Sequence, residues 1–279
     1  MIPPVADRFV AGETAAEALE HARRLRGDGV GAILNLLGEH YTDPEPAAED
    51  AAAYRRLVAD IGGTDLDARV SVKPTQLGLG IDRETFEENL ASVVDTAREE
   101  GVFLWIDMED SSTTDATLDA FERFVAEHPE MGVCLQANLR RTPEDIDRLA
   151  GAGGAIRLVK GAYDEPSSVA HQGRATVDTA YEDCLARLFR NYEGTVAVGS
   201  HDPRMVNRAL ALHREHGTPV EMQMLMGVRE RAQRDLARQW PVYQYVPYGG
   251  RWLSYFSRRV AERRENLSFA LRAVAGLGA

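Results

Sequence analysis

Residues 245–263, YVPYGGRWLSYFSRRVAER, join the last strand candidate of the chain to a long helical pattern. The strand-like run breaks at the turn 247–250, and the spacing after it predicts a helix. Paired guanidinium groups on a helix suit a ligand with a carboxylate, because each planar fork can hold two oxygens. A solvated basic helix with i,i+4 charge pairs is the alternative that this local pattern leaves open. The side chains that share one face, at i, i+3, i+4 and i+7, are Tyr255, Arg258, Arg259 and Glu262.

Strand and helix patterns alternate along the rest of the chain. Amphipathic stretches at 83–100, 114–127 and 174–192 predict helices. Eight strands alternating with helices predict a single α/β domain over residues 1–279, a (β/α)₈ barrel of the TIM type. We expect an extra N-terminal helix, and a C-terminal helix that carries substrate-binding residues. A doubly wound sheet would use the same alternation, but no strand candidate is followed by a GxGxxG fingerprint. The strand candidates are 32–37, 69–73, 103–107, 132–137, 155–160, 195–200, 220–225 and 242–246.

Three helix starts carry local signals. Thr14 and Glu17 form a predicted capping box, in which each side chain accepts a hydrogen bond from the other end of the first turn. Thr142-Pro143 and Asp202-Pro203 each place a cap residue before a proline, which predicts a helix beginning at that point.

The chain has 44 acidic and 32 basic residues, for a net charge of −12. This balance argues against a nucleic-acid partner, whose phosphates would be repelled. The only lysines are Lys73 and Lys160, so 32 − 2 = 30 residues are arginine. GC-rich codon usage or adaptation to salt would each explain the loss of lysine. A lysine is a compact charge whose pKa can shift when it is buried, which a guanidinium cannot imitate, so the two lysines are expected to have a specific role. Chance survival of two surface lysines is the alternative.

The two cysteines, Cys134 and Cys184, lie in apolar patterns and do not form a disulfide framework. With no apolar run of about 20 residues and no signal peptide, a cytoplasmic location is expected. No pair of residues has zinc-site spacing and no nucleophile elbow is present, so we expect no metal and no serine-hydrolase chemistry.

Polar residues stand at or near the ends of seven strand candidates, where catalytic groups gather in a barrel. Each alone could be a turn residue, a cap or a satisfied histidine. Together at equivalent heights they predict a site at one end of the barrel. They are Lys73, Asp107, Gln136, Lys160, His201, Gln223 and Tyr245.

Ordered blocks along the chain are similar to those of proline dehydrogenases, from about residue 8 to residue 272, and the segment 245–263 resembles their C-terminal signature. The resemblance implies a (β/α)₈ flavoenzyme that oxidises L-proline to Δ1-pyrroline-5-carboxylate by hydride transfer to FAD, the first step of proline catabolism to glutamate. The blocks are RFVAGET (8–14), LLGE (36–39), SVKPTQLGL (71–79), IDMEDS (106–111), VCLQANLRRT (133–142), RLVKGAY (157–163) and HDPR (201–204).

The resemblance also implies roles for individual residues. Arg258 and Arg259 would clamp the substrate carboxylate with help from Lys73, and Glu39 and Asp107 would pair with these arginines. Tyr245 would pack on the proline ring, and Arg157 would lie near flavin N5. The implied catalytic residues are Lys73, Asp107, Arg157 and Tyr245. The implied cofactor-binding residues are Gln136, Arg157, Lys160, Gly161, Ala162, Tyr163, Ser200, His201, Gln223, Leu225 and Glu262.

Several points stay open at the level of the sequence. The chain departs from the family pattern at Arg264, Met226 and Asn35, where proline, Tyr or His, and Asp are common. The resemblance implies quinone or another membrane electron acceptor, so a peripheral contact at the inner face of the cell membrane is expected. The oligomeric state is open. The alternatives are a Schiff-base aldolase or lyase built on Lys160, a non-catalytic amino-acid-binding barrel, and oxidation of trans-4-hydroxyproline or another cyclic amino acid.

Overall fold

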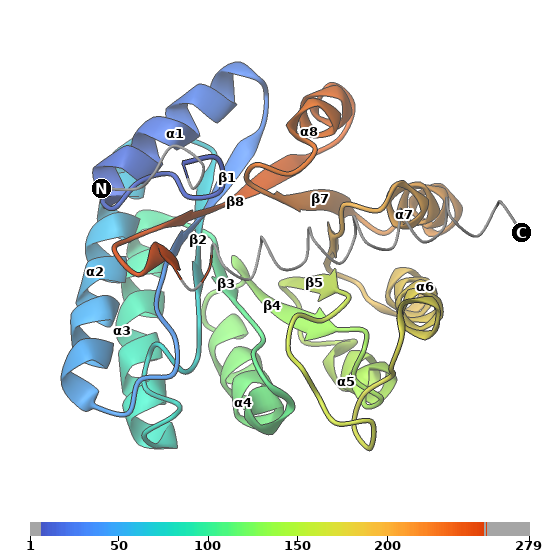
Figure 1. Ribbon diagram of the computed structural model, residues 1–279, viewed down its shortest axis with the longest axis horizontal. Helices are drawn as coiled ribbons and strands as arrows, with labels where there is room; N and C mark the ends of the chain where they lie inside the picture. The colour runs from blue at the N-terminus through green and yellow to red at the C-terminus, as the bar shows by residue number, and fades with distance from the viewer. Residues whose placement is uncertain (1–6, 254, 256–279) are drawn as a thin grey trace, which may run out of the picture.

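The computed structural model describes residues 7–253 and residue 255. Within them, eight parallel strands close into a barrel in sequence order, and helices surround the strands (Figure 1). The prediction of a (β/α)₈ barrel is confirmed. The strands are β1 (Gly31–Leu36), β2 (Ala68–Val72), β3 (Leu104–Ile106), β4 (Met131–Gln136), β5 (Ala155–Val159), β6 (Thr195–Gly199), β7 (Val220–Leu225) and β8 (Val242–Tyr248).

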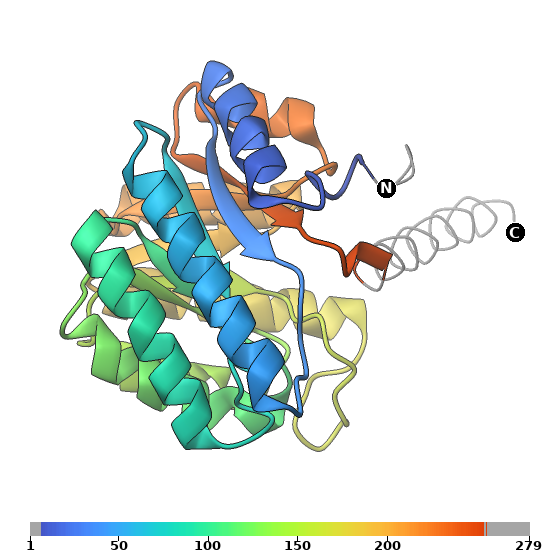
Figure 2. The same cartoon turned by 90° about the vertical axis from the view of Figure 1, so that its left-hand side faces the viewer.

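The helices bury apolar stripes against the outside of the strands. In α3, for example, Leu90, Val93 and Val94 are buried, a spacing that places them on one helical face. Helices α2 and α3 run side by side across the face turned to the viewer in Figure 2. The helices are α1 (Ala15–Gly27), α2 (Pro44–Gly62), α3 (Arg83–Glu100), α4 (Thr114–Val125), α5 (Thr142–Leu149), α6 (Arg174–Asn191), α7 (Pro203–His216) and α8 (Glu230–Ala237), with a short 3₁₀ turn, η1 (Ser111–Thr113).

The predicted helix starts are mostly confirmed. Thr14 and Glu17 form the capping box of α1, and Asp202 caps α7 by accepting a hydrogen bond from the Arg204 amide. The helix predicted at Thr142-Pro143 is also present as α5, but Thr142 is not its cap residue. Thr142 is already helical and Arg141 precedes it, while the Thr142 hydroxyl donates to the carbonyl of Gln136 at 2.5 Å and so ties α5 to the end of β4.

The last strand is longer than the sequence suggested. We expected a break at 247–250, yet β8 continues to Tyr248 because β1 still pairs with it there. Pro247 has no amide hydrogen to donate, but its carbonyl accepts from the Ala11 amide at 2.8 Å. The carbonyl of Tyr248 accepts from the Leu37 amide at 2.8 Å.

Alternate residues of each strand point into the barrel, and their chemistry changes with height. The lower layer is mainly apolar and aromatic and includes Ile33, Trp105, Ala155, Ala197 and Tyr243. The residues two positions further along these strands form the next layer, which is polar at most positions. The strands thereby hold polar side chains at one height, all buried except the partly buried Tyr245, and these are Asn35, Ser71, Asp107, Arg157, Gln223 and Tyr245.

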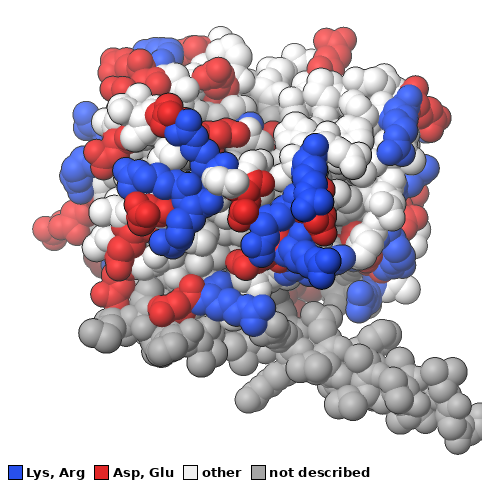
Figure 3. Space-filling model, turned by 90° about the horizontal axis from the view of Figure 1, so that it is seen from above, with Lys and Arg blue, Asp and Glu red and all other residues white. Residues whose placement is uncertain are grey.

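Outside the barrel, arginines pair with neighbouring acids. Arg148 lies 2.6 Å from Asp119, and Arg187 pairs with Asp147. Basic and acidic side chains are interspersed on the face drawn in Figure 3. Among the described residues, no helix has the length and apolar character needed to cross a bilayer.

Candidate active site

Asp107, directly after β3, accepts hydrogen bonds from side chains of three other strands at the centre of the polar layer. Its Oδ1 accepts a hydrogen bond from the Ser71 hydroxyl at 2.7 Å and one from the Arg157 guanidinium. Its Oδ2 accepts from the Tyr245 hydroxyl at 2.7 Å. Because β2, β3, β5 and β8 each supply one of these groups, closure of the barrel is what assembles them.

Burial and charge act in opposite directions on the pKa of Asp107. Burial would raise it, but Arg157 and Lys73 together with hydrogen bonds from Tyr245 and Ser71 hold the pKa below its usual range. Burial and the neighbouring Asp107 carboxylate raise the pKa of the Tyr245 phenol well above its usual range. For Arg157, burial opposes the charge, but Asp107 outweighs it and the pKa is raised. The site therefore contains an ionised Asp107, a neutral Tyr245 and a charged Arg157 at neutral pH.

Arg157 is 4% exposed and held on several sides. Its Nη1 donates to Gln223 Oε1 at 3.2 Å, and its Nη2 donates to the Ser71 hydroxyl at 3.3 Å as well as to Asp107. Its Cζ atom lies 4.9 Å from the centre of the Trp105 ring, a cation–π distance. The barrel thus fixes the orientation of a buried cation.

Lys73 follows β2 and reaches the same region. Its Nζ donates to Asn35 Oδ1 at 3.2 Å, and Asn35 Nδ2 donates to the Ser71 carbonyl at 2.9 Å. Asn35 stands where an aspartate was expected from the resemblance. A neutral amide here orients the Lys73 ammonium without adding another negative charge beside Asp107.

Gln136, the last residue of β4, is held by two backbone groups. Its Nε2 donates to the Glu109 carbonyl at 2.7 Å, and its Oε1 accepts from the Ala162 amide at 3.3 Å. Gly161 has φ of +120°, and a Cβ at that position would overlap the Asn138 side chain, so only glycine fits. Gln136 therefore ties the end of β4 to the loop after β5, where Gly161 and Ala162 are exposed and Tyr163 is half-buried.

Lys160, directly after β5, pairs with two acids of the neighbouring helices. Its Nζ bonds to Asp178 of α6 and lies 3.4 Å from Asp202, the cap of α7. Arg204 pairs with both acids, at 2.6 and 2.8 Å. This arrangement joins β5, α6 and α7 and does not suit a Schiff-base lysine, which needs a free amine.

The residues after β6 and at the end of β7 contact each other. His201 Nε2 accepts from the Leu225 amide at 3.2 Å, and the His201 carbonyl accepts from Arg229 Nη1 at 2.5 Å. Ser200 is buried, and its hydroxyl accepts from the Asp202 amide at 3.2 Å. These groups line the same end of the barrel as Gln136 and the loop at 161–163.

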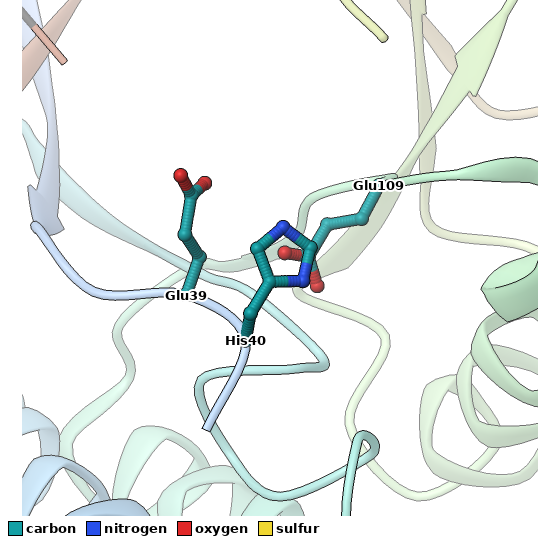
Figure 4. A group of neighbouring side chains, drawn as sticks. All are labelled: Glu39, His40 and Glu109. Carbon is teal, nitrogen blue, oxygen red and sulfur yellow. The ribbon is translucent and has the colours of Figure 1, made fainter. Parts of the chain in front are cut away.

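Among the described residues, one group has donor atoms spaced as metal ligands could be: Glu39, His40 and Glu109 lie within 4.8 Å of one another (Figure 4). Glu109 is already occupied, since its oxygens accept from the amide and the hydroxyl of Thr75, each at 2.7 Å. Lys73 is also close enough to lower the pKa of Glu109, although burial is the larger influence and the pKa is raised overall. A nearby ammonium group opposes a bound cation, so we assign no metal to this group.

Three polar residues in or near this site were not predicted from the sequence. Ser71 and Glu109 lie inside the blocks SVKPTQLGL and IDMEDS, but nothing in the sequence indicated that they bond to Asp107 and to Thr75. Glu221, one layer below Arg157, was not predicted to have a role. A signal existed for Glu221, because an acid two positions before Gln223 on a buried strand must face the same interior. Arg258, Arg259 and Glu262 lie outside the described residues.

The carboxyl ends of the barrel strands hold a buried cation (Arg157), an ionised carboxylate (Asp107) and the side-chain amides of Gln136 and Gln223. Enzymes with this fold carry their catalytic groups at the same end of the barrel. The family profile described as proline dehydrogenase matches residues 18–272. Proline dehydrogenase 2 of Bacillus subtilis is 34% identical over 271 residues, covering 96% of this chain and 89% of that protein. Proline dehydrogenase of Deinococcus radiodurans is 34% identical over 279 residues, covering 96% and 89%. The chain belongs to the proline dehydrogenase family.

Solved structures agree on the fold. Proline utilization A of Bdellovibrio bacteriovorus is 24% identical, with a TM-score of 0.83 over 91% of this chain. The protein of the same name from Corynebacterium freiburgense is 23% identical, with a TM-score of 0.79 over 96% of this chain. This chain spans about a third, 32%, of each of those longer chains.

Proposed function

We propose that this protein oxidises L-proline to Δ1-pyrroline-5-carboxylate with FAD as the hydride acceptor, as the first step of proline catabolism. Family membership supports the substrate, because the relatives that align over nearly the whole chain are named proline dehydrogenases. The observation that carries the proposal is the buried Arg157, which Asp107 and Gln223 hold at the carboxyl end of the barrel.

The residues present fit a flavin. The polar edge of an isoalloxazine ring alternates hydrogen-bond acceptors with one N–H donor, so it needs a cation and groups that can both donate and accept. Arg157, Gln136, Gln223 and His201 form such a set at one end of the barrel, and Asn138 Oδ1 is a buried acceptor without a hydrogen-bond partner among the described residues. When bound, FAD would supply the two-electron oxidant that side chains lack. The proposed cofactor-binding residues on other loops are Lys160, Gly161, Ala162, Tyr163, Ser200, Leu225 and Glu262.

The substrate side of the proposal uses the polar layer and the C-terminal arginines. Arg258 and Arg259 bind the proline carboxylate, and Lys73 assists them. Tyr245 packs on the proline ring, while its hydroxyl remains bonded to Asp107. Proline then loses a hydride from a ring carbon and a proton from its nitrogen, which leaves the C=N bond of the product.

The charges of the site serve this reaction. Arg157 would add positive charge beside the hydride acceptor, which gains negative charge as the hydride leaves proline. Asp107 and Glu39 balance the cations while no substrate is present, because unpaired buried charge is costly. The physiological acceptor of the electrons is proposed to be quinone or another membrane acceptor, reached at the inner face of the cell membrane from the cytoplasm.

The test is a measurement of the product. Purified protein is incubated with L-proline and an artificial electron acceptor, and Δ1-pyrroline-5-carboxylate is quantified by mass spectrometry. Arg157→Met, which keeps most of the volume and removes the charge, serves as the comparison. We expect product with the wild type and at least about 100-fold less with the variant, the size of effect seen when one transition-state donor is removed. Wild-type protein that forms no product would contradict the proposal.

A further inference from the structure

Below Arg157 the barrel interior holds an ion pair that the proposed chemistry does not use. Glu221 of β7 accepts two hydrogen bonds from Nη1 of Arg69 on β2, at 2.9 and 3.0 Å. The Cζ atom of Arg69 lies 3.7 Å from the ring centre of Tyr243 and 4.5 Å from that of Phe103. Glu221 is 4% exposed. Stacking on the two aromatic rings holds the Arg69 guanidinium in place, and the guanidinium in turn holds the Glu221 carboxylate.

Gln223, two residues further along β7, links this ion pair to Arg157. Its Nε2 donates to Glu221 Oε1 at 2.7 Å, and its Oε1 accepts from Arg157 Nη1 at 3.2 Å. An ionised carboxylate only accepts hydrogen bonds and a guanidinium only donates them. One orientation of the Gln223 amide therefore satisfies both neighbours, with its carbonyl toward Arg157.

We propose that Glu221 is a positioning residue for catalysis: through the Gln223 amide it sets the orientation of the Arg157 guanidinium. This inference rests on the proposed function, in which Arg157 is a catalytic residue. Without a carboxylate at position 221, the Gln223 amide can turn over and place its NH₂ group against Arg157. Two donors then face each other, and Arg157 loses one of the bonds that hold it.

The first test compares E221Q with a matched control, D145N. Both variants replace a buried carboxylate that pairs with an arginine, since Asp145 of α5 accepts from Arg141 at 2.9 Å. Asp145 belongs to α5, outside the barrel strands, and in the described part of the chain its side-chain hydrogen bonds go to Arg141 and to no residue of the proposed site. We expect both variants to melt at a lower temperature than the wild type. Only E221Q should show a fall in kcat for proline, by about tenfold or more, with a much smaller change in KM.

A second measurement does not depend on turnover. The midpoint potential of the bound flavin should become more negative in E221Q, because a displaced Arg157 stabilises the electron-rich reduced form less. It should stay unchanged in D145N. A lowered melting temperature with unchanged kcat and potential in E221Q would mean that Glu221 is structural only, and the proposal would be wrong.

A rescue variant separates orientation from loss of charge. In the double variant E221Q/Q223E, the carboxylate at position 223 can accept from Arg157 with either oxygen, so no amide has to be oriented. Because Gln223 is also a proposed cofactor-binding residue, the readout for this variant is the position of the Arg157 guanidinium in protein without cofactor. We expect the guanidinium to return to its wild-type position, and a guanidinium displaced as far as in E221Q contradicts the proposal.

Crystal structures of the wild type and E221Q without cofactor test the proposed role of Glu221 independently of enzyme activity. The Arg157 guanidinium should be shifted in E221Q and return in E221Q/Q223E, and an unmoved guanidinium overturns the proposal. Wild-type protein that contains no flavin, or whose flavin proline does not reduce, would instead contradict the proposed function and leave this structural test in place.

Discussion

Asp107 and Arg157, 50 positions apart in the sequence, form an ion pair inside the barrel. Asp107 uses both carboxylate oxygens, because Tyr245 and Ser71 also donate to it. Arg157 in turn reaches Gln223. Substitution of either residue of this pair leaves the other as a buried charge with too few partners, so both activity and stability should change.

Asp107→Asn should lose both stability and activity. Breaking a buried, hydrogen-bonded ion pair typically costs about 3–5 kcal/mol of unfolding free energy, because the remaining charge is uncompensated. Urea unfolding at neutral pH measures this loss. Ser71→Ala, which removes one hydroxyl donor to the same carboxylate, is the control and should cost about 1 kcal/mol. Equal losses in the two variants would show that the charge of Asp107 matters little.

The same variant should show a specific pH dependence. The folded-state pKa of Asp107 is lowered, so the stabilisation it provides is fully present above the ordinary carboxyl range and is lost as pH falls through the folded pKa. The stability difference between wild type and Asp107→Asn should therefore be constant from about pH 5 to 7 and shrink below about pH 4. A difference that grows on acidification would contradict the lowered pKa.

Glu109 should behave in the opposite way. Burial raises its folded-state pKa above 4.5, although hydrogen bonds from Thr75 oppose the shift. Between the unfolded and the folded pKa, the folded protein binds more protons, so stability falls as pH rises. Glu109→Gln removes this titration and should gain stability relative to the wild type as pH increases from 4.5 through that interval. Parallel melting curves over the same pH series would exclude the prediction.

The eight strands were predictable because they are mainly apolar runs of three to seven residues, buried on both faces by the barrel and its helices. The predicted and the observed strand limits differ by one or two residues. At Tyr248, for example, β8 is longer than predicted because its pairing with β1 continues through a proline. Pattern in the sequence cannot show such pairing, because it depends on the neighbouring strand.

The residue types of the site were predictable, but their partners were not. Alternation along a strand indicates that a polar residue faces inward, yet the register of other strands decides what it contacts. Asp107 was expected to pair with the C-terminal arginines. In the described part of the chain it bonds to Arg157 on β5 instead. Lys160 was expected at the cofactor, and its ion pairs with Asp178 and Asp202 follow from helix packing that no local motif encodes.

Arg258→Lys and Arg259→Lys test the proposed carboxylate clamp, which lies outside the described residues. Lysine keeps the charge but loses the planar fork, so KM for proline should rise. Truncating such a pair costs about 2–5 kcal/mol, and lysine should recover part of that. A smaller fall in kcat is expected because a loosened carboxylate misplaces the reacting carbon. Flavin content should stay near that of the wild type. Unchanged KM in both variants would mean that Arg258 and Arg259 do not bind the substrate and only add charge to the surface.

The excess of acids predicts a response to salt. With 44 acidic and 32 basic residues, exposed carboxylates repel one another, and salt screens this over a Debye length of about 3 Å at 1 M. If the composition reflects adaptation to salt, the melting temperature should rise with added KCl. Surface ion pairs such as Arg148–Asp119 weaken under the same conditions and limit the gain. A flat or falling melting temperature across the titration would favour codon usage as the reason for the missing lysines.

The visible absorption spectrum of the purified protein, recorded without oxygen before and after addition of L-proline, is the direct test of FAD-dependent proline oxidation. We expect a yellow protein whose flavin absorbance is bleached by proline. We also expect FAD to be released on denaturation, as a cofactor without a covalent bond to the protein would be. A protein that cannot be reconstituted with FAD, or a bound flavin that proline leaves oxidised, would contradict it.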